Sequence, residues 1–192
     1  SRMRAWLMGT DAAGAYTLTL AEVARPEPKS GEILVKVHTT SLNRGEFIRG
    51  SRVAAVRTDA NLRPCGLEAA GEVVAVGAGV DSIAVGSRVM GRANGGFAEY
   101  TTMDARETLG VPHRMSWDEA GACAIVFLTA YDLVIAGGHL KKGEWLLVTG
   151  ASSGVGVACV QIARVLGAHS IGTSGAQAKL GHENPGRATA TK

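Results

Sequence analysis

Cysteine is scarce in this chain of 192 residues, with Cys65, Cys123 and Cys159 lying far apart in the sequence. Three dispersed cysteines provide neither a disulfide framework nor a Cys-x-x-Cys metal knuckle. We therefore expect a reducing compartment and a cytoplasmic protein. Cys65 and Cys123 are expected to be small, buried apolar residues.

Aromatic residues and net charge are also low. The chain has 3 Trp, 3 Tyr and 3 Phe, and its net charge is +3. Arg2 supplies one of these charges and residues 176–192 supply two, with three basic residues against one acidic residue, so the rest of the chain is close to neutral. A protein that binds nucleic acid usually carries a basic patch within its fold. The sequence therefore argues against a nucleic-acid partner.

Long hydrophobic runs are missing as well. The longest uncharged apolar stretch, residues 120–131, is closed by Glu119 and Asp132, whereas a bilayer span needs about 20 residues. The start of the chain turns polar directly after Met3, so we expect no signal peptide. Ser1 and Arg2 resemble a cloning remnant. These features predict a protein without a membrane partner.

Glycine, by contrast, is abundant, with 26 residues, which indicates many tight turns. Ile33, Val35 and Val37 alternate with Leu34, Lys36 and His38, as in a half-buried strand, and His38 falls on the more polar face. Further strands are expected at residues 72–76 and 87–90 and after the turn at residues 95–100. Short strands separated by glycine favour a small barrel.

The pattern changes at Ser116. Ser116 and Glu119 form a capping box, which predicts a helical stretch towards Ile135 that ends at Gly137 and Gly138. Residues 145–149 then form a continuous apolar run, as in a parallel strand buried on both faces. Such a strand needs helices beside it, so an α/β unit is expected to follow.

A glycine-rich loop follows this run, and a helix over residues 157–166 and a strand over residues 169–173 are expected after it. Glycines let the backbone approach a pyrophosphate, which bare amides at a helix N-terminus can bind. The alternative is a tight strand-to-helix turn, but the complete strand–loop–helix–strand order favours a dinucleotide. The absence of a lysine after the last glycine argues against an ATPase or GTPase. The loop residues are Gly150, Ala151, Ser152, Ser153, Gly154, Val155 and Gly156.

The absence of an acidic residue after the loop indicates which cofactor is preferred. NAD sites usually place an acidic residue about 20 positions after the loop, and here none occurs between Glu144 and Glu183. Ser174 and Lys179 lie there instead, and a hydroxyl with a cation suits the 2′-phosphate of NADPH. The alternative for Lys179 is an ordinary surface lysine.

Several motifs together resemble the medium-chain dehydrogenase/reductase superfamily, and within it the zinc-free quinone oxidoreductases of the zeta-crystallin-like group. The resemblance implies an α/β fold with a β-rich part, in which a GroES-like N-terminal barrel precedes the start of a Rossmann (doubly wound) nucleotide-binding domain. The matching segments are residues 28–35, 41–44, 66–71, 95–100 and 128–131 and the loop that begins at Gly150.

The resemblance also implies roles for individual residues. Asn43 and Leu67 stand where zinc-dependent relatives have Cys and His, so no metal is expected. Asn43 would face the nicotinamide and orient it, which is the one catalytic role implied; the alternative is an amide that caps a turn. Thr129 would contact the nicotinamide half, the loop would line the pyrophosphate, and Ser174 and Lys179 would hold the 2′-phosphate. Ser153 stands where related loops often have glycine.

The expected domains are a GroES-like barrel over residues 3–124, the start of a Rossmann domain over 125–179 and an irregular tail over 180–192. The tail is unlike the family's next helix and strand, so we expect a foreign tail or a deliberate truncation. Two functions stay open. One is an NADPH-dependent reductase of quinones or α,β-unsaturated carbonyls, including enoyl reductases. The other is a non-catalytic remnant that folds and self-associates. An unfinished sheet also predicts a homo-oligomer, with a dimer expected.

Overall fold

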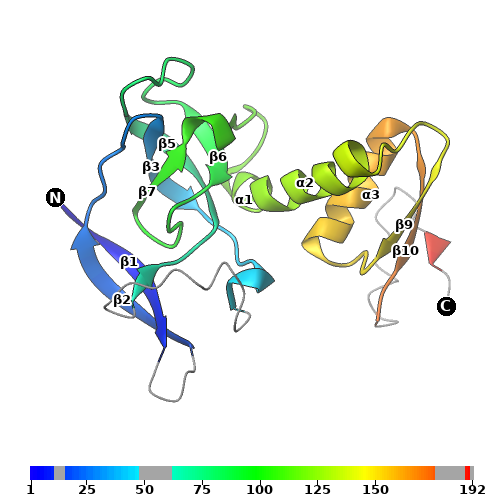
Figure 1. Cartoon of the computed structure of the whole chain (residues 1–192), viewed down its shortest axis with the longest axis horizontal. Coiled ribbons are helices and arrows are strands. Elements are labelled where there is room, and N and C mark those ends of the chain that lie inside the picture. Colours follow the sequence, from blue (N-terminus) through cyan, green and yellow to red (C-terminus); the bar gives the residue numbers. More distant parts are fainter. Residues whose placement is uncertain (11–15, 48–61, 176–188, 191–192) are drawn as a thin grey trace. The chain divides into compact units, whose positions relative to one another are not determined.

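The computed structural model describes residues 1–10, 16–47, 62–175 and 189–190. The chain forms two compact units, Ser1–Ile125 and Val126–Lys192, whose elements are drawn in Figure 1.

The first unit is built from two antiparallel sheets. The smaller has the order β2-β1-β4, with β1 (Arg2–Thr10), β2 (Tyr16–Ala24) and β4 (Arg63–Pro64). The larger has the order β7-β3-β5-β6-β8, with β3 (Glu32–Thr39), β5 (Glu68–Val76), β6 (Arg88–Arg92), β7 (Tyr100–Asp104) and β8 (Thr108–Gly110). A bridge between Ala5 and Ala98 links the sheets. The alternating strand at residue 33 and the predicted β-rich fold are confirmed.

The core of this unit lies on the inner face of the larger sheet. Ile33, Val35, Val73 and Met103 are completely buried there, each at 0% exposure. Alternation along β3 and β5 places Ile33, Val35 and Val73 on one face, because successive residues of a strand point to opposite sides, and Met103 comes from the neighbouring β7, where it pairs with Ile33.

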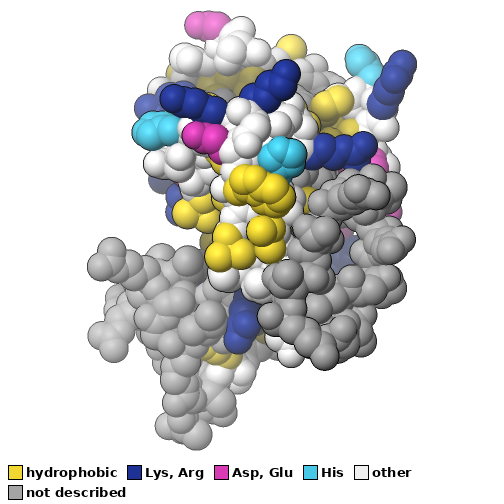
Figure 2. Space-filling model, turned by 90° about the vertical axis from the view of Figure 1, so that its right-hand side faces the viewer, with side chains coloured by type: hydrophobic (Ala, Val, Ile, Leu, Met, Phe, Trp, Pro, Cys, Tyr) yellow, Lys and Arg dark blue, Asp and Glu magenta, His cyan; other side chains and the backbone are white. Residues whose placement is uncertain are grey.

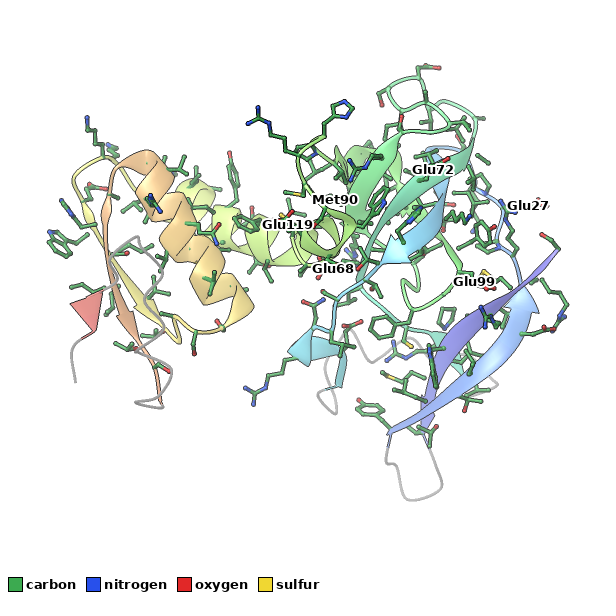
Figure 3. The ribbon with its side chains drawn as sticks, turned by 180° about the vertical axis from the view of Figure 1, so that it is seen from behind. Glu27, Glu68, Glu72, Met90, Glu99 and Glu119 are labelled. Atoms are coloured by element: carbon green, nitrogen blue, oxygen red, sulfur yellow. The ribbon has the colours of Figure 1, made fainter. Side chains whose placement is uncertain are left out.

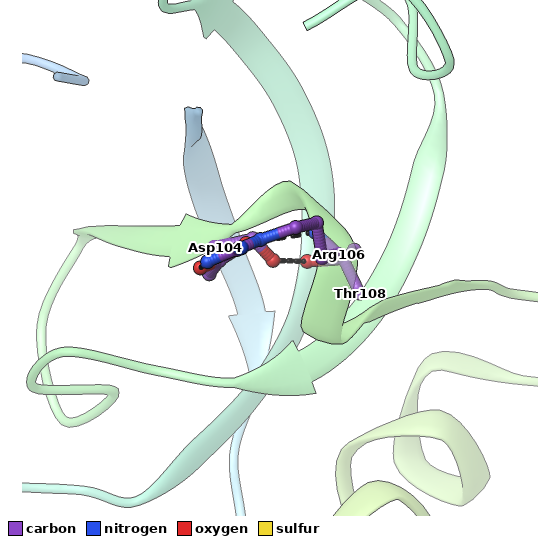
Figure 4. Close-up of polar contacts among 3 residues, drawn as sticks. All are labelled: Asp104, Arg106 and Thr108. Atoms are coloured by element: carbon purple, nitrogen blue, oxygen red, sulfur yellow. Dashed lines mark hydrogen bonds and ion pairs between the residues drawn. The ribbon is translucent and has the colours of Figure 1, made fainter. Parts of the chain in front are cut away.

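Short turns and helices connect the strands. Asp104 ends β7 and caps the 3-10 turn η3 (Ala105–Glu107) by accepting from the peptide N–H of Arg106, and the Thr108 hydroxyl donates to the Asp104 carbonyl, as Figure 4 shows. The capping box at Ser116 is confirmed at the start of α1 (Trp117–Gly121). His38 is exposed and stacks on Trp117, with ring centroids 4.4 Å apart.

The helical stretch after Ser116 is broken into two helices and a turn. α2 (Ala124–Tyr131) follows α1 and continues into a π-helical turn, η4 (Asp132–Gly137). The π turn itself carries no sequence signal that we recognised. Among the residues described, no helix has the length and apolar character needed to cross a membrane.

The second unit is a parallel sheet with helices packed on one of its faces. Its strand order is β11-β10-β9, with β9 (Trp145–Thr149), β10 (His169–Thr173) and β11 (Thr189–Ala190). α3 (Gly154–Leu166) begins three residues earlier than expected and ends at Gly167, whose φ of 69° suits glycine. Ala130, Val134, Val148 and Ala158 form the core between the helices and the sheet.

One expectation for this unit is wrong: β9 is not buried on both faces. Trp145 and Leu147 are each 64% exposed, while Val148 is 6% exposed. Figure 2, which views the side of the molecule at the right of Figure 1, shows hydrophobic side chains on this surface. Helices cover one face of the sheet, and no described segment covers the side chains of Trp145 and Leu147, which explains their exposure.

Candidate functional site

The predicted site residues fall in both units, and those of the first unit gather around Glu68. Glu68 begins β5 and is 0% exposed. Its Oε1 accepts from the Ser41 hydroxyl and from Asn43 Nδ2, the latter at 2.9 Å, and its Oε2 accepts from the peptide N–H of Ile125 at 2.8 Å. Asn43 is thus bonded to a buried carboxylate, and among the described residues its side chain caps no turn.

Glu46 fixes the backbone beside this cluster. Its Oε2 accepts from the peptide N–H of Asn43 at 2.8 Å, and its own N–H donates to the Asn43 carbonyl at 3.0 Å. Glu46 is 3% exposed, and its Oε1 has no hydrogen-bond partner within the described part of the chain. Burial raises the pKa of Glu46, and the nearby charge of Glu68 adds to this, although the N–H of Asn43 opposes the shift.

Sequence reasoning missed both of these carboxylates. Glu68 lies within a motif that carries the family resemblance, but in this motif only Leu67, at a zinc-ligand position of the relatives, received a predicted role. The available signal was a single acidic residue in the small-residue run Gly66-Leu-Glu-Ala-Ala-Gly71, because a carboxylate in a buried strand needs donors around it. Glu46 follows Asn43 by three residues and had no comparable signal.

A groove of about 650 Å³ opens beside the same cluster in the first unit. Ser41 lies in its wall, and its hydroxyl donates to Glu68, which is labelled in Figure 3. Most of the lining is apolar, and the exposed rings and chains of Trp6, Leu18, Leu20 and Leu42 belong to it. A cavity of this size and character suits an apolar small molecule.

The predicted loop of the second unit lies between β9 and α3. The N–H of Ala151 donates to the Thr173 carbonyl, the N–H of Ser153 to the Gly150 carbonyl, and the N–H of Gly156 to Ser153 Oγ at 3.1 Å. The N–H groups of Ser152, Gly154 and Val155 have no acceptor among the residues that the structure describes. Bare N–H groups at a helix N-terminus are a site for an anion.

The glycines of this loop serve different purposes. Gly150 adopts a φ of 74°, which glycine takes without strain, and nothing lies within 4 Å of where its Cβ would be. A Cβ on Gly156 would lie 2.4 Å from the Gly150 carbonyl oxygen. Gly156 therefore allows the helix to pack closely on the loop, whereas Gly150 allows the chain to turn. Ser153 caps the helix, so its presence in place of a glycine has a structural reason.

Three further site residues were predicted in this part of the chain: Ser174, Thr129 and Lys179. Ser174 follows β10, and its hydroxyl lies 3.4 Å from that of Ser152. This contact brings the proposed phosphate hydroxyl next to the loop. Thr129 is an exposed residue of α2. Lys179 lies outside the described residues.

No group of three or more His, Cys, Asp or Glu side chains that could hold a metal ion occurs in the described ranges. Cys65 is buried and its thiol donates to the Trp6 carbonyl at 3.1 Å. Burial, with a further contribution from Glu46, raises the pKa of Cys65 to about 11. A thiol with this pKa stays protonated at neutral pH.

Comparison with known proteins gives the first unit a family. Residues 29–113 match the alcohol dehydrogenase GroES-like domain. A quinone oxidoreductase of Pongo abelii is 34% identical over 159 residues, which cover 82% of this chain and 48% of that protein. The polyketide synthase GfsB of Streptomyces halstedii is 34% identical over 174 residues, which cover 88% of this chain and 3% of that protein.

Solved structures extend the similarity over both units. A mycobacterial protein, Rv1454c, complexed with NADPH matches with a TM-score of 0.84 and 29% identity, covering 98% of this chain and 57% of that one. The chain spans about half the length of the quinone oxidoreductases that it matches. With its GroES-like first unit and the strand–helix–strand order of its second unit, the chain belongs to the medium-chain dehydrogenase/reductase superfamily.

Proposed function

We propose that the protein is a zinc-independent oxidoreductase that takes a hydride from NADPH and delivers it to a quinone or another α,β-unsaturated carbonyl compound. The observation that carries this proposal is the set of bare N–H groups of Ser152, Gly154 and Val155 at the start of α3. They offer a pyrophosphate hydrogen-bond donors and the positive end of the helix dipole. The relatives named above, one of them complexed with NADPH, support the same class of activity.

When bound, NADPH supplies a hydride from C4 of its nicotinamide, and the acceptor takes one proton from water, which yields NADP⁺ and a hydroquinone or a saturated carbonyl compound. The residues of this chain would bind and orient. The loop holds the pyrophosphate, Thr129 contacts the nicotinamide half and Asn43 orients the nicotinamide. A quinone is already electron-poor, so correct placement supplies much of the catalysis.

Zinc independence rests on the residues at the two ligand positions. Neither the Asn43 amide, whose nitrogen is bonded to Glu68, nor the aliphatic Leu67 is a normal zinc ligand. We also propose a cytoplasmic location, which fits the three free thiols of Cys65, Cys123 and Cys159.

The preference for NADPH is supported by Ser174, whose hydroxyl adjoins the loop, and by the proposed role of Lys179. Replacing Ser174 with Asp would place a carboxylate where the 2′-phosphate lies, so Ser174→Asp should weaken NADPH binding about tenfold or more and spare NADH. Fluorescence titrations with both cofactors measure this. Ser82→Asp, an exposed position in the first unit, is the control; equal losses for NADPH and NADH would count against the assignment.

The groove beside Ser41 supports an apolar acceptor. Its exposed Trp6, Leu18 and Leu20 side chains suit the ring or tail of a quinone better than a charged substrate. Relatives among both quinone oxidoreductases and polyketide synthases leave two acceptor classes, so a small quinone and a 2-enoyl thioester should be assayed side by side.

The central test is an NADPH fluorescence titration at modest salt, followed by NADPH consumption with each acceptor. Saturable binding and acceptor-dependent consumption would support the proposal. Well-folded protein without a saturable signal would overturn it for this chain.

One observation favours a second candidate, a non-catalytic protein that folds and self-associates. Trp145 and Leu147 are each 64% exposed on β9, and exposed apolar side chains on an edge strand invite pairing with another copy. We propose a homodimer under either function. Light scattering that gives a monomer mass at high concentration would argue against it, and cofactor binding separates the two functions.

A further inference from the structure

Glu68 is a buried acid that the proposed function leaves without a role. It is 0% exposed, and within the described residues no lysine or arginine forms an ion pair with it. Leaving a carboxylate in a protein interior is costly unless hydrogen-bond donors surround it. The donors that do surround it show what the side chain holds in place.

Three donors converge on the two carboxylate oxygens. Ser41 and Asn43 come from the loop after β3 and share Oε1, while the N–H of Ile125 comes from the first turn of α2 and takes Oε2. The backbone carbonyl of Glu68 also accepts from the Thr40 hydroxyl at 2.6 Å. Glu68 therefore anchors the segment that carries Asn43 at several points.

This arrangement settles how the Asn43 amide is turned. An ionised carboxylate can only accept hydrogen bonds, so the NH₂ group of Asn43 must face it and the Oδ1 must face away. The nitrogen lies 2.9 Å from Glu68 Oε1 and 3.4 Å from Ser41 Oγ, so the NH₂ group faces acceptors within the cluster. Among the described residues, Oδ1 accepts no hydrogen bond.

We propose that Glu68 is the positioning residue of Asn43 and that it turns the Oδ1 of Asn43, an acceptor, toward the ligand. The proposal rests on the proposed function. An acceptor at this place suits the carboxamide NH₂ of a nicotinamide, whereas the carbonyl of a quinone or enone needs a donor. Asn43 thus orients the cofactor and leaves the acceptor molecule's carbonyl to water or another group.

The first test uses the side-chain amide signals of the full chain in ¹H–¹⁵N spectra. The sequence contains four asparagines and two glutamines, so Asn43→Ala identifies the Asn43 pair. Glu68→Gln keeps the shape of the side chain but puts an NH₂ group among three donors. It should move the Asn43 signals towards those of a free amide, and Ser41→Ala should move them less. Glu72→Gln, at an exposed position of the same strand (Figure 3), should leave them in place.

The second test measures NADPH oxidation with a quinone. Glu68→Gln should lower kcat about tenfold with little change in KM for NADPH, and in an Asn43→Ala background it should add less than about twofold, because residues that act through one another are not additive. Circular dichroism checks that each variant is folded. Unmoved Asn43 signals in Glu68→Gln, or an equal loss of rate in both backgrounds, would overturn the proposal. If the unsubstituted chain consumes no NADPH, the proposed function fails, and the spectra still decide whether Glu68 orients Asn43.

Discussion

The two units use their strands in opposite ways. β5 of the first unit carries Glu68, Ala69, Ala70, Gly71 and Glu72, a modestly apolar run, yet its first four residues are buried. β9 of the second unit carries Trp145, Leu146, Leu147 and Val148, and of these Val148 alone is buried. β5 lies between β3 and β6, while β9 has β10 as its one described neighbour in the sheet.

Burial in this protein is therefore determined by neighbouring elements more than by the hydropathy of the strand itself. A carboxylate can reach 0% exposure in β5 because hydrogen-bond donors from the preceding loop and from α2 meet it there. Tryptophan stays 64% exposed in β9 because the described residues place no element over it. The candidate site residues differ between the units in the same way. The first unit (the closed unit) fixes a polar cluster among buried strands, whereas the second unit (the open unit) presents backbone N–H groups.

The largest expected effect comes from comparing a buried side chain of the first unit with an exposed one of the second. Met103→Ala removes a completely buried side chain from the first unit and should lower the free energy of unfolding by about 2–5 kcal/mol. Leu147→Ala removes a side chain that is 64% exposed and should cost about 0.5 kcal/mol or less. Urea unfolding followed by circular dichroism measures both. Equal costs would mean that β9 is covered in solution and would break the comparison.

The sequence was a good guide to the elements and a poor guide to their surroundings. The capping box at Ser116 and the strand at residues 145–149 were predicted because their signals are local. The same apolar run led to the wrong expectation that Trp145 and Leu147 are buried, since a run of apolar residues records what a strand can bury and not which segments are there to cover it.

A second prediction concerns tight backbone contacts, which occur at one glycine in each unit. A Cβ on Gly156 would lie 2.4 Å from the Gly150 carbonyl oxygen, and a Cβ on Gly71 would lie 2.0 Å from the Lys36 carbonyl oxygen. Both neighbours are backbone atoms that cannot rotate away. Gly156→Ala and Gly71→Ala should therefore each cost about 1–3 kcal/mol of stability, and Gly156→Ala should also weaken NADPH binding.

Gly110→Ala is the matched control for this pair, because nothing lies within 4 Å of its Cβ position and its φ is not in the left-handed region. Thermal unfolding and NADPH titration of the three variants give the comparison. If Gly156→Ala behaves like Gly110→Ala, the contact between the loop and α3 is not tight, and the bare N–H groups lose the support that holds them in position.

The candidate site also has a part that the sequence predicts and a part that it does not. The loop could be predicted, because strand, glycines and helix follow one another in the chain. The partners of Asn43 could not, because Glu68 and Ile125 lie 25 and 82 positions away in the sequence, and only folding of β5 and α2 brings them to one carboxylate. A lone acidic residue in a strand indicates a buried polar contact but does not name the donors.

The smallest expected effect concerns a surface contact of the closed unit. The side chain of Arg106 donates to both oxygens of Asp104, at 3.1 Å and 2.6 Å, and its peptide N–H adds a further bond. These bonds lower the pKa of Asp104 to about 2, from an ordinary value of 3.8. Because the pKa is lower in the folded chain, the stabilisation is complete above pH 3.8 and is lost as the pH falls towards 2.

Asp104→Asn should therefore change the melting temperature little at pH 7, since exposed ion pairs contribute little, while making its decline between pH 4 and pH 2 shallower. Asp81→Asn, at another exposed aspartate of the same unit, is the control, and differential scanning calorimetry over this pH range gives both curves. An unchanged slope in Asp104→Asn would show that the contact does not persist in solution. A large loss at pH 7 would be more serious, because it would mean that the closed unit depends on its surface contacts as well as on its core, and the contrast with the open unit would then need another explanation.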